Sequence, residues 1–280
     1  MILLMDMSEI SKYMVLEKAV GETPLSCAEA YRALHPELEG VSMAYAGRLD
    51  PMASGKLLIL LGDECKQQEN YHGLDKEYEF SVLLGIESDS QDVMGRIKAE
   101  ENSTFNRTIS SDSLSAAASE LVGKIELPYP IFSSKTVQGK PLHTWTMEGR
   151  LDEISIPTKE SEIYSFKFDK LETIPRANIV EQALAKVNSV PPVTELRKAL
   201  GNDFRRIDVR KDWNDILNND SLPVTYQIAH FTCLASSGTY MRTLASVIAK
   251  ELGTVGLAWH IHRKTIGTYN SEEKTWLRIF

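Results

Sequence analysis

The sequence is poor in the features that define secreted, membrane and zinc-binding proteins. Its three cysteines, Cys27, Cys65 and Cys233, lie far apart and form no CxxC pair. This odd, scattered set predicts neither a disulfide framework nor a zinc site, and it favours a reducing cytoplasm. The purely apolar run Leu57–Leu61 is only five residues long, far too short to span a bilayer. The apolar start, Met1–Met5, has no basic lead and no long apolar core, so we expect no signal peptide.

Positive charge is scarce as well. The chain carries 31 Lys and Arg against 39 Asp and Glu, which gives a formal net charge of −8. Taken alone, this charge argues against a nucleic-acid partner, because RNA binding needs a basic footprint. Only a local basic patch would allow one. With 280 residues, 42% of them hydrophobic, the chain is long and apolar enough for one or two globular domains.

Hydrophobic periodicity predicts interleaved strands and helices. In Glu77–Leu84 every second residue from Tyr78 onward is apolar, which is typical of a half-buried strand. Thr23 followed by Pro24 is a typical helix start, and the helix should reach Leu34. Further strands are expected at Tyr13–Glu17, Leu57–Leu61, Glu162–Thr173, Thr225–Leu234 and Gly256–Thr268. Further helices are expected at Glu64–His72, Ser111–Leu121, Pro141–Glu148 and Thr239–Leu252, whereas Arg205–Asp220 is expected to be charged and irregular. This interleaving predicts an α+β fold.

The most specific pattern is AYAGRLDPMASG, residues 44–55. Asp50 precedes Pro51, and the residue before a proline is pushed out of the helical region. The loop can therefore hold a carboxylate in a cleft. A bare Leu-Asp-Pro would be an ordinary surface turn in most proteins, so the neighbouring residues decide the interpretation.

This stretch resembles the catalytic motif of the TruB family of pseudouridine synthases, which reads roughly GHxGxLDPxAxGxL. The positions that match in order and spacing are Gly47, Leu49, Asp50, Pro51, Ala53, Gly55 and Leu57. The resemblance continues in family order through DKEYEF (75–80), LGIESDSQDVMG (84–95), YPIFSSKTVQGKPLH (129–143), SSGTYMRTL (236–244) and HRKTIGTY (262–269). It covers about residues 13–270, almost the whole chain.

The resemblance implies the pseudouridine synthase fold, a central mixed or antiparallel sheet with flanking helices and a catalytic cleft, as one domain over residues 1–280. Asp50 would be the catalytic carboxylate, and Arg242 would pair with it and keep it ionised. Tyr78 would stack on a flipped uridine and help to remove its C5 proton. Without the motifs, Tyr78 would be a core aromatic and Arg242 a surface group. The reaction needs neither metal nor other cofactor, because it involves no redox step and no phosphate transfer.

Seven further residues are assigned to substrate binding by the resemblance: Lys18, Tyr45, Asp89, Lys135, Tyr240, Ile261 and Arg263. Core packing explains Ile261 equally well, and turn capping explains Asp89. Basic residues also gather at Lys135–His143, Arg205–Lys211 and His262–Lys264. These groups are either solvated surface or the places where an acidic chain concentrates charge for RNA.

The chain departs from the family pattern in two ways. Tyr45 stands where the family has a histidine that engages the flipped RNA, although a tyrosine can stack in its place. Most family members also carry a small C-terminal RNA-binding domain, the PUA domain, and we expect none here. Residues 189–224 are longer than the family pattern, and we hypothesise that Arg205–Lys211 compensates by binding RNA.

The expected function is isomerisation of a uridine in the T loop of tRNA, at conventional position 55. We expect a cytoplasmic monomer with no membrane segment and no obligatory protein partner. Two alternatives stay open. The chain could act mainly as an RNA-folding module that has kept the cleft, or as an assembly subunit like the relatives that use guide RNA, although it is short for partner-binding domains.

Overall fold

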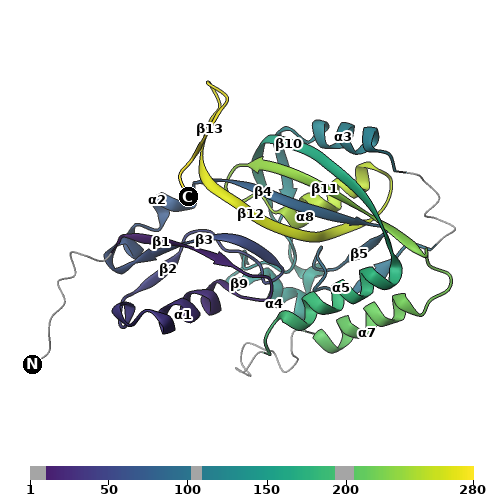
Figure 1. Cartoon of the computed structure of the whole chain (residues 1–280), viewed down its shortest axis with the longest axis horizontal. Helices are drawn as coiled ribbons and strands as arrows, with labels where there is room; N and C mark the ends of the chain where they lie inside the picture. Colours follow the sequence, from purple (N-terminus) through teal and green to yellow (C-terminus); the bar gives the residue numbers. More distant parts are fainter. Residues whose placement is uncertain (1–10, 102–108, 193–204) are drawn as a thin grey trace, which may run out of the picture.

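A nine-stranded mixed sheet forms the centre of the protein (Figure 1). The computed structural model describes residues 11–101, 109–192 and 205–280. The sheet has strand order β1-β3-β12-β4-β11-β10-β7, with β2 paired to β3 and β13 paired to β12. All these pairings are antiparallel except that of β3 with β12, which is parallel. The expected α+β class with a central mixed sheet is confirmed.

The strands of the large sheet are β1 (Tyr13–Lys18), β2 (Met43–Tyr45), β3 (Ala53–Leu61), β4 (Asp75–Leu84), β7 (Gly123–Pro128), β10 (Thr158–Pro175), β11 (Thr225–Ala235), β12 (Gly256–Asn270) and β13 (Thr275–Arg278). Two small hairpins consist of β5 (Ile86–Ser88) with β6 (Ile97–Ala99) and β8 (Thr136–Val137) with β9 (Lys140–Pro141). The helices are α1 (Pro24–Leu34), α2 (Glu69–His72), α3 (Ser111–Glu120), α4 (Leu142–Met147), α5 (Arg176–Ser189), α7 (Arg206–Leu217) and α8 (Met241–Glu251). Short 3₁₀ helices are η2 (Pro36–Leu38), η3 (Gly62–Gln67) and η4 (Leu151–Glu153).

Strand β4 occupies the middle of the sheet, between β12 and β11. Its alternation is the one expected from the sequence: Tyr78, Phe80 and Val82 are buried, whereas Glu79 on the other face is exposed. The buried face packs into the main core together with α8, whose apolar stripe includes Leu244. Ser81 and Leu83 on the other face are buried as well, so the strand that carries Tyr78 is held on both edges and, over its second half, on both faces.

Helix α1 begins where Thr23 and Pro24 predict. The Thr23 hydroxyl accepts a hydrogen bond from the backbone N–H of Ser26, and the Ser26 hydroxyl accepts one from the backbone N–H of Thr23. This reciprocal cap satisfies two donors that the first helical turn leaves free. No helix among residues 11–101, 109–192 and 205–280 is long and apolar enough to cross a membrane.

Two sequence expectations about local structure were wrong. Residues 205–220 are not irregular, because α7 occupies most of that stretch. Val209, Trp213 and Ile216 are buried at helical spacing, and the charged residues between them hide this stripe in the sequence. The single helix expected at Glu64–His72 is instead η3 followed by the short α2. Part of the unusually long stretch 189–224, residues 193–204, lies outside the described residues.

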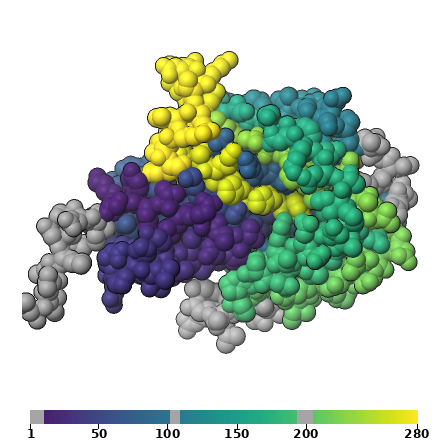
Figure 2. Space-filling model, in the orientation of Figure 1, coloured from purple at the N-terminus to yellow at the C-terminus, as the bar shows by residue number. Residues whose placement is uncertain are grey.

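The long strand β12 runs from the middle of the sheet into a projecting hairpin. Its far end pairs with β13, and this hairpin stands out from the rest of the surface (Figure 2). Its middle, Ile261–Arg263, pairs in parallel with Ala53–Gly55 at the start of β3. At this crossing Gly55 has a φ of +106°, and a Cβ there would lie 2.3 Å from the carbonyl oxygen of Arg263. Only glycine permits this approach.

We expect Gly55→Ala to lower the free energy of unfolding by about 3 kcal/mol or more. A positive φ costs a non-glycine residue about 1–3 kcal/mol, and the overpacked contact adds about 1–3 kcal/mol. Gly62→Ala is the matched control, because Gly62 has a φ of +55° but open space around its Cα. Urea unfolding of the two variants measures the difference. Equal losses would contradict a steric role for the crossing.

Candidate active site

The centre of the site is an ion pair between a loop carboxylate and a buried guanidinium. Asp50 lies in the loop between β2 and β3, and its side chain is 41% exposed. Arg242, the second residue of α8, is 4% exposed and donates from Nε to Oδ2 of Asp50 over 2.7 Å. The two residues are 192 positions apart in the sequence. A charge-assisted hydrogen bond of this length fixes the direction of the carboxylate.

Both terminal nitrogens of the Arg242 guanidinium are also hydrogen-bonded. Its Nη1 donates to the carbonyl of Ser90 over 2.9 Å, and its Nη2 donates to the carbonyl of Phe132 over 3.2 Å. A second carboxylate, Asp92, lies 3.7 Å from Nε and is itself buried. Burial opposes the charge on Arg242, but Asp50 and Asp92 outweigh it and raise the pKa of the guanidinium. The arginine is therefore permanently charged and has no freedom to turn away from Asp50.

The buried carboxylate Asp92 has its own partners. One oxygen, Oδ1, accepts hydrogen bonds from the hydroxyl of Ser90 over 2.7 Å and from the backbone N–H of Met94 over 2.9 Å. Burial nevertheless raises the pKa of Asp92, while Arg242 acts in the opposite direction. This residue lies behind Arg242, whereas Asp50 lies on the solvent side. Of the two carboxylates, only Asp50 is open to a substrate.

Tyr78 projects from β4 near the same carboxylate. It is 9% exposed, and it lies opposite Arg263 of β12 in the strand register. Burial raises the pKa of its hydroxyl, the positive charge of Arg263 opposes the shift, and the charge of Asp50 adds to it. The phenol is therefore neutral at physiological pH. The three residues that the sequence analysis placed in one site do belong to one electrostatic neighbourhood.

Two further aromatic residues extend the site along one side. Tyr240 caps the start of α8, and its ring contacts that of Tyr129 edge to face at 5.5 Å between centroids. The ammonium of Lys135 lies 5.0 Å above the Tyr129 ring. Burial raises the pKa of Tyr240, and the charge of Asp50 contributes to the shift. Tyr240, Tyr129 and Lys135 thus form an aromatic and basic wall beside Asp50.

Lys18 and Arg263 are placed differently from the sequence expectation. We expected both to meet the substrate, but they are 0% and 1% exposed and lie beneath the loop that carries Asp50. Lys18 donates to the carbonyl of Ala53 over 2.5 Å. Arg263 donates to the carbonyls of Gly47 over 3.1 Å and Arg48 over 3.4 Å. Arg263 therefore binds the backbone of the loop, and Lys18 binds the first residue of β3 directly after it, so both cations hold the loop in place.

Other predicted residues lie at the margins. Tyr45 in β2 packs against the separate core cluster under α1, and Ile261 is 4% exposed in the main core. Asp89 is bound by Arg205, whose Nη2 donates to Oδ1 over 3.2 Å. The structure therefore brings Tyr240 close to Asp50, whereas Tyr45 and Ile261 contribute to packing.

Sequence reasoning missed Lys76, although Lys76 stands two residues before Tyr78 in the DKEYEF motif. Lys76 is 5% exposed; its ammonium donates to the carbonyl of Leu74 and, over 3.1 Å, to the hydroxyl of Ser237. It also lies next to Gly47, where an added Cβ would be 3.6 Å from its Cε. Burial lowers the pKa of Lys76 to about 8.

Within the described residues, no three His, Cys, Asp or Glu side chains are grouped as metal ligands are.

Comparisons with known proteins agree with this geometry. The family model described as TruB family pseudouridylate synthase, N-terminal domain, matches residues 37–184, more than half of the chain. The chain belongs to the TruB family of pseudouridylate synthases.

Among relatives of this TruB-family chain, tRNA pseudouridine synthase B of Caldicellulosiruptor saccharolyticus is 28% identical over 75% of the chain and 73% of its own length. The tRNA pseudouridine synthase 4 of Saccharomyces cerevisiae is 29% identical over 76% of the chain but only 57% of its own length. A chain in the crystal structure of a Cbf5–Nop10–Gar1 complex has a TM-score of 0.52 at 15% identity, covering 93% of this chain and 50% of that one. This last likeness shows the fold.

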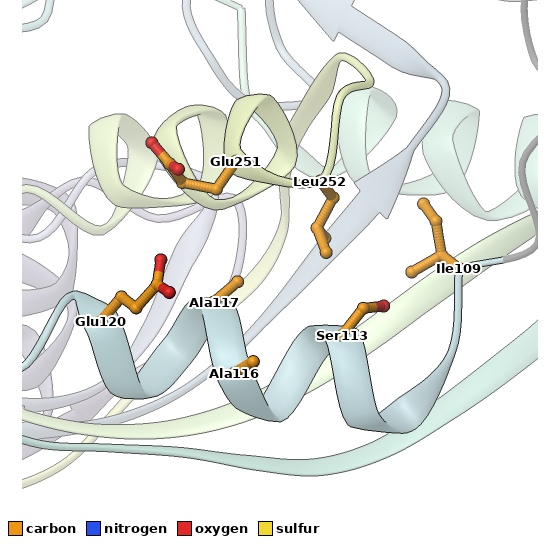
Figure 3. A pocket seen from close by; sticks show the side chains of 7 residues that line it. All are labelled: Ile109, Ser113, Ala116, Ala117, Glu120, Glu251 and Leu252. Carbon is orange, nitrogen blue, oxygen red and sulfur yellow. The ribbon is translucent and has the colours of Figure 1, made fainter.

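A hollow in the surface lies apart from this site (Figure 3). It separates α3 from the C-terminal end of α8, and its lining residues are Ile109, Ser113, Ala116, Ala117, Glu120, Glu251 and Leu252. None of the side chains described above as surrounding Asp50 lines it. The hollow therefore has no part in the chemistry of the TruB-family site.

The shifted pKa of Lys76 predicts a pH dependence of stability. Its pKa is about 8 in the fold against 10.5 ordinarily, so between these values the unfolded chain binds more protons. Stability should therefore rise with pH in this window, by at most about 1.4 kcal/mol per pH unit. We expect Lys76→Met to make this rise less steep and not to abolish it, because burial also lowers the pKa of Lys18 to about 8. Urea unfolding of both proteins from pH 7 to 10 tests it, and parallel curves would contradict the assignment.

Proposed function

We propose that this TruB-family chain converts uridine to pseudouridine in tRNA, at the T-loop position 55. The observation that carries the proposal is the Asp50 carboxylate, which is half open to solvent, bound by the buried Arg242 and next to Tyr78. Relatives named tRNA pseudouridine synthase support tRNA as the substrate. The T-loop position rests on the family resemblance.

The chemistry fits the residues present. The reaction breaks the bond between N1 of the uracil and C1′ of the ribose, forms a bond from C5 to C1′, and moves the C5 proton to another atom. Substrate and product are isomers, so the balance needs no oxidant or co-reactant. Asp50 supplies the carboxylate that attacks the base or the sugar, and Arg242 holds it in place by a charge-assisted hydrogen bond. Because the Tyr78 hydroxyl is neutral, it acts by stacking and by passing a proton on rather than as a preformed phenolate.

Binding of an anionic RNA by an acidic protein requires positive charge at the mouth of the site. Many of the basic residues in the three groups noted in the sequence do not supply this positive charge. Lys140, Lys211 and Lys264 pair with nearby glutamates or aspartates, and Arg206 is buried. We propose instead that Arg48 and Lys135, both exposed beside Asp50 and Tyr240, meet the RNA backbone. The protein would act as a monomer without an obligatory protein partner.

We expect Asp50→Asn to reduce pseudouridine formation at least about 1,000-fold while tRNA affinity stays within about 3-fold of the parent. The amide keeps the size of the carboxylate but has no negative charge to act as nucleophile. The assay incubates the protein with an unmodified tRNA transcript and maps pseudouridine by chemical labelling. Asp63→Asn, at a 94% exposed side chain, is the control and should behave like the parent. Full activity of Asp50→Asn would show that Asp50 is not the catalytic carboxylate, whereas a parent protein that binds tRNA and forms no pseudouridine would favour an RNA-folding module.

We expect Tyr78→Phe to slow the single-turnover rate about 100-fold with little change in tRNA affinity. Phenylalanine keeps the stacking face and loses the hydroxyl, and a positioned proton-transfer group contributes about 10²–10⁴-fold. Tyr71→Phe is the matched control, because the Tyr71 hydroxyl bonds Glu64 next to α2, outside the site. A Tyr78→Phe protein with the parental rate would assign this residue to stacking alone.

A further inference from the structure

Helix α7 is fastened at three points to the segment that follows β5, residues 89–97. Arg205, directly before the helix, binds the carboxylate of Asp89 with both terminal nitrogens. Asp212 accepts from Nε of Arg96 over 2.6 Å and from the backbone N–H of Ile97 over 3.1 Å. The indole N–H of Trp213 donates to the carbonyl of Val93 over 3.2 Å. The helix therefore fixes the 89–97 segment along its length.

This segment provides two of the groups that fix Arg242. The carbonyl of Ser90 accepts from Nη1 over 2.9 Å, and Asp92 lies 3.7 Å from Nε. Asp89, which Arg205 binds, is the residue directly before Ser90. A displacement of Asp89 would therefore move the acceptor that orients the Arg242 guanidinium, and with it the partner of Asp50.

Arg205 reaches the other side of Arg242 as well. Its guanidinium carbon lies 4.4 Å above the ring of Phe132, and the carbonyl of Phe132 accepts from Nη2 of Arg242 over 3.2 Å. Arg205 thus contacts Asp89, the residue before one Arg242 acceptor, by charge. It also lies over the ring of Phe132, the residue that provides the other acceptor. A planar guanidinium can make both contacts at once, whereas an ammonium cannot.

Arg205 has an unfavourable backbone conformation that these side-chain contacts offset. Its φ is +62°, in the left-handed region that is costly for residues other than glycine. It also places a cation at the N-terminus of α7, where the helix dipole disfavours positive charge. Both features persist because the side chain is held by Asp89 and Phe132. The Arg205 side chain is only 19% exposed, so its charge is directed inward and not toward solvent.

We propose that Arg205 is a positioning residue for the Asp50–Arg242 pair: it acts through Asp89 and Phe132 on the two carbonyls that orient Arg242. This inference rests on the proposed function, because its effect is read in the isomerisation rate. It replaces the expectation that the Arg205–Lys211 group binds RNA. A positioning role predicts a slower chemical step at saturating tRNA, whereas an RNA contact predicts weaker binding with an unchanged saturated rate.

The test measures single-turnover rate and tRNA affinity separately, at two salt concentrations, for the parent, Arg205→Ala, Arg205→Lys and Asp89→Asn. We expect Arg205→Ala to slow the saturated rate about 10–100-fold, the range for removing a residue that orients a functional group. We expect tRNA affinity and its salt dependence to stay within about 2-fold of the parent. Arg205→Lys should restore less than half of the loss, because lysine keeps the charge without the fork.

Lys211→Ala is the matched control. Lys211 lies in the same helix, but it is 72% exposed and pairs only with Asp215. It should leave both rate and affinity unchanged. If Arg205→Ala does not fold, as judged by thermal unfolding, Asp89→Asn replaces it, because the amide keeps the acceptor for the Arg96 N–H while losing the charge. If both single variants fold, the double variant Arg205→Ala with Asp89→Asn should be no slower than the slower single variant.

The outcomes separate the two proposals. A parent protein that forms no pseudouridine in tRNA overturns the proposed function. An active parent together with a folded Arg205→Ala that keeps the parental saturated rate overturns the positioning role. A loss confined to tRNA affinity, with a lower salt dependence, also overturns it and assigns Arg205 to the RNA backbone instead.

Discussion

The bond between Arg242 and Asp50 is the interaction on which the site depends. A guanidinium that is 4% exposed is costly to bury unless every donor is used and its charge is balanced. The fold offsets this cost with the Ser90 and Phe132 carbonyls and with the carboxylates of Asp50 and Asp92, groups that come from three separate segments. Bringing these segments together around one arginine fixes the position of the loop that carries Asp50. The same requirement explains why the site is assembled from residues far apart in the sequence.

Positive charge is concentrated around the Asp50 loop although the protein as a whole is acidic. The chain has a formal net charge of −8, yet Lys18, Lys76 and Arg263 are all buried close to the Asp50 loop. Each donates to backbone carbonyls, which are acceptors that do not neutralise a charge. Their positive potential therefore extends to the loop that carries Asp50. Burial lowers the pKa of both lysines to about 8, so they lie close to the point at which that potential would weaken.

The sequence motifs predicted the pairing of Asp50 with Arg242, and alternation predicted the strand that carries Tyr78. The pairing was implied by the family resemblance of the two motifs, whereas the strand follows from local spacing, which a sequence displays directly. The direction of long basic side chains is not displayed in this way. Arg205 belongs to a run of charged residues that composition assigns to the surface, yet it turns inward to Asp89. Arg263 likewise reads as an RNA contact beside His262, but the strand register places it beneath the loop. Only the tertiary pairing of β12 with β3 and β4 decides on which face it lies.

That pairing also connects the sheet to the chemistry. Arg263 stands opposite Gly55 of β3 and opposite Tyr78 of β4, and its side chain reaches the carbonyl of Gly47 in the catalytic loop. Because successive side chains of a strand point to opposite faces, a slip of one residue in β12 would turn Arg263 away from the loop. The short parallel contact between β3 and β12 would break at the same time, since only Gly55 tolerates the backbone of Arg263 so close. The position of Asp50 therefore depends on the register of the sheet, which is fixed where β12 passes Gly55 of β3.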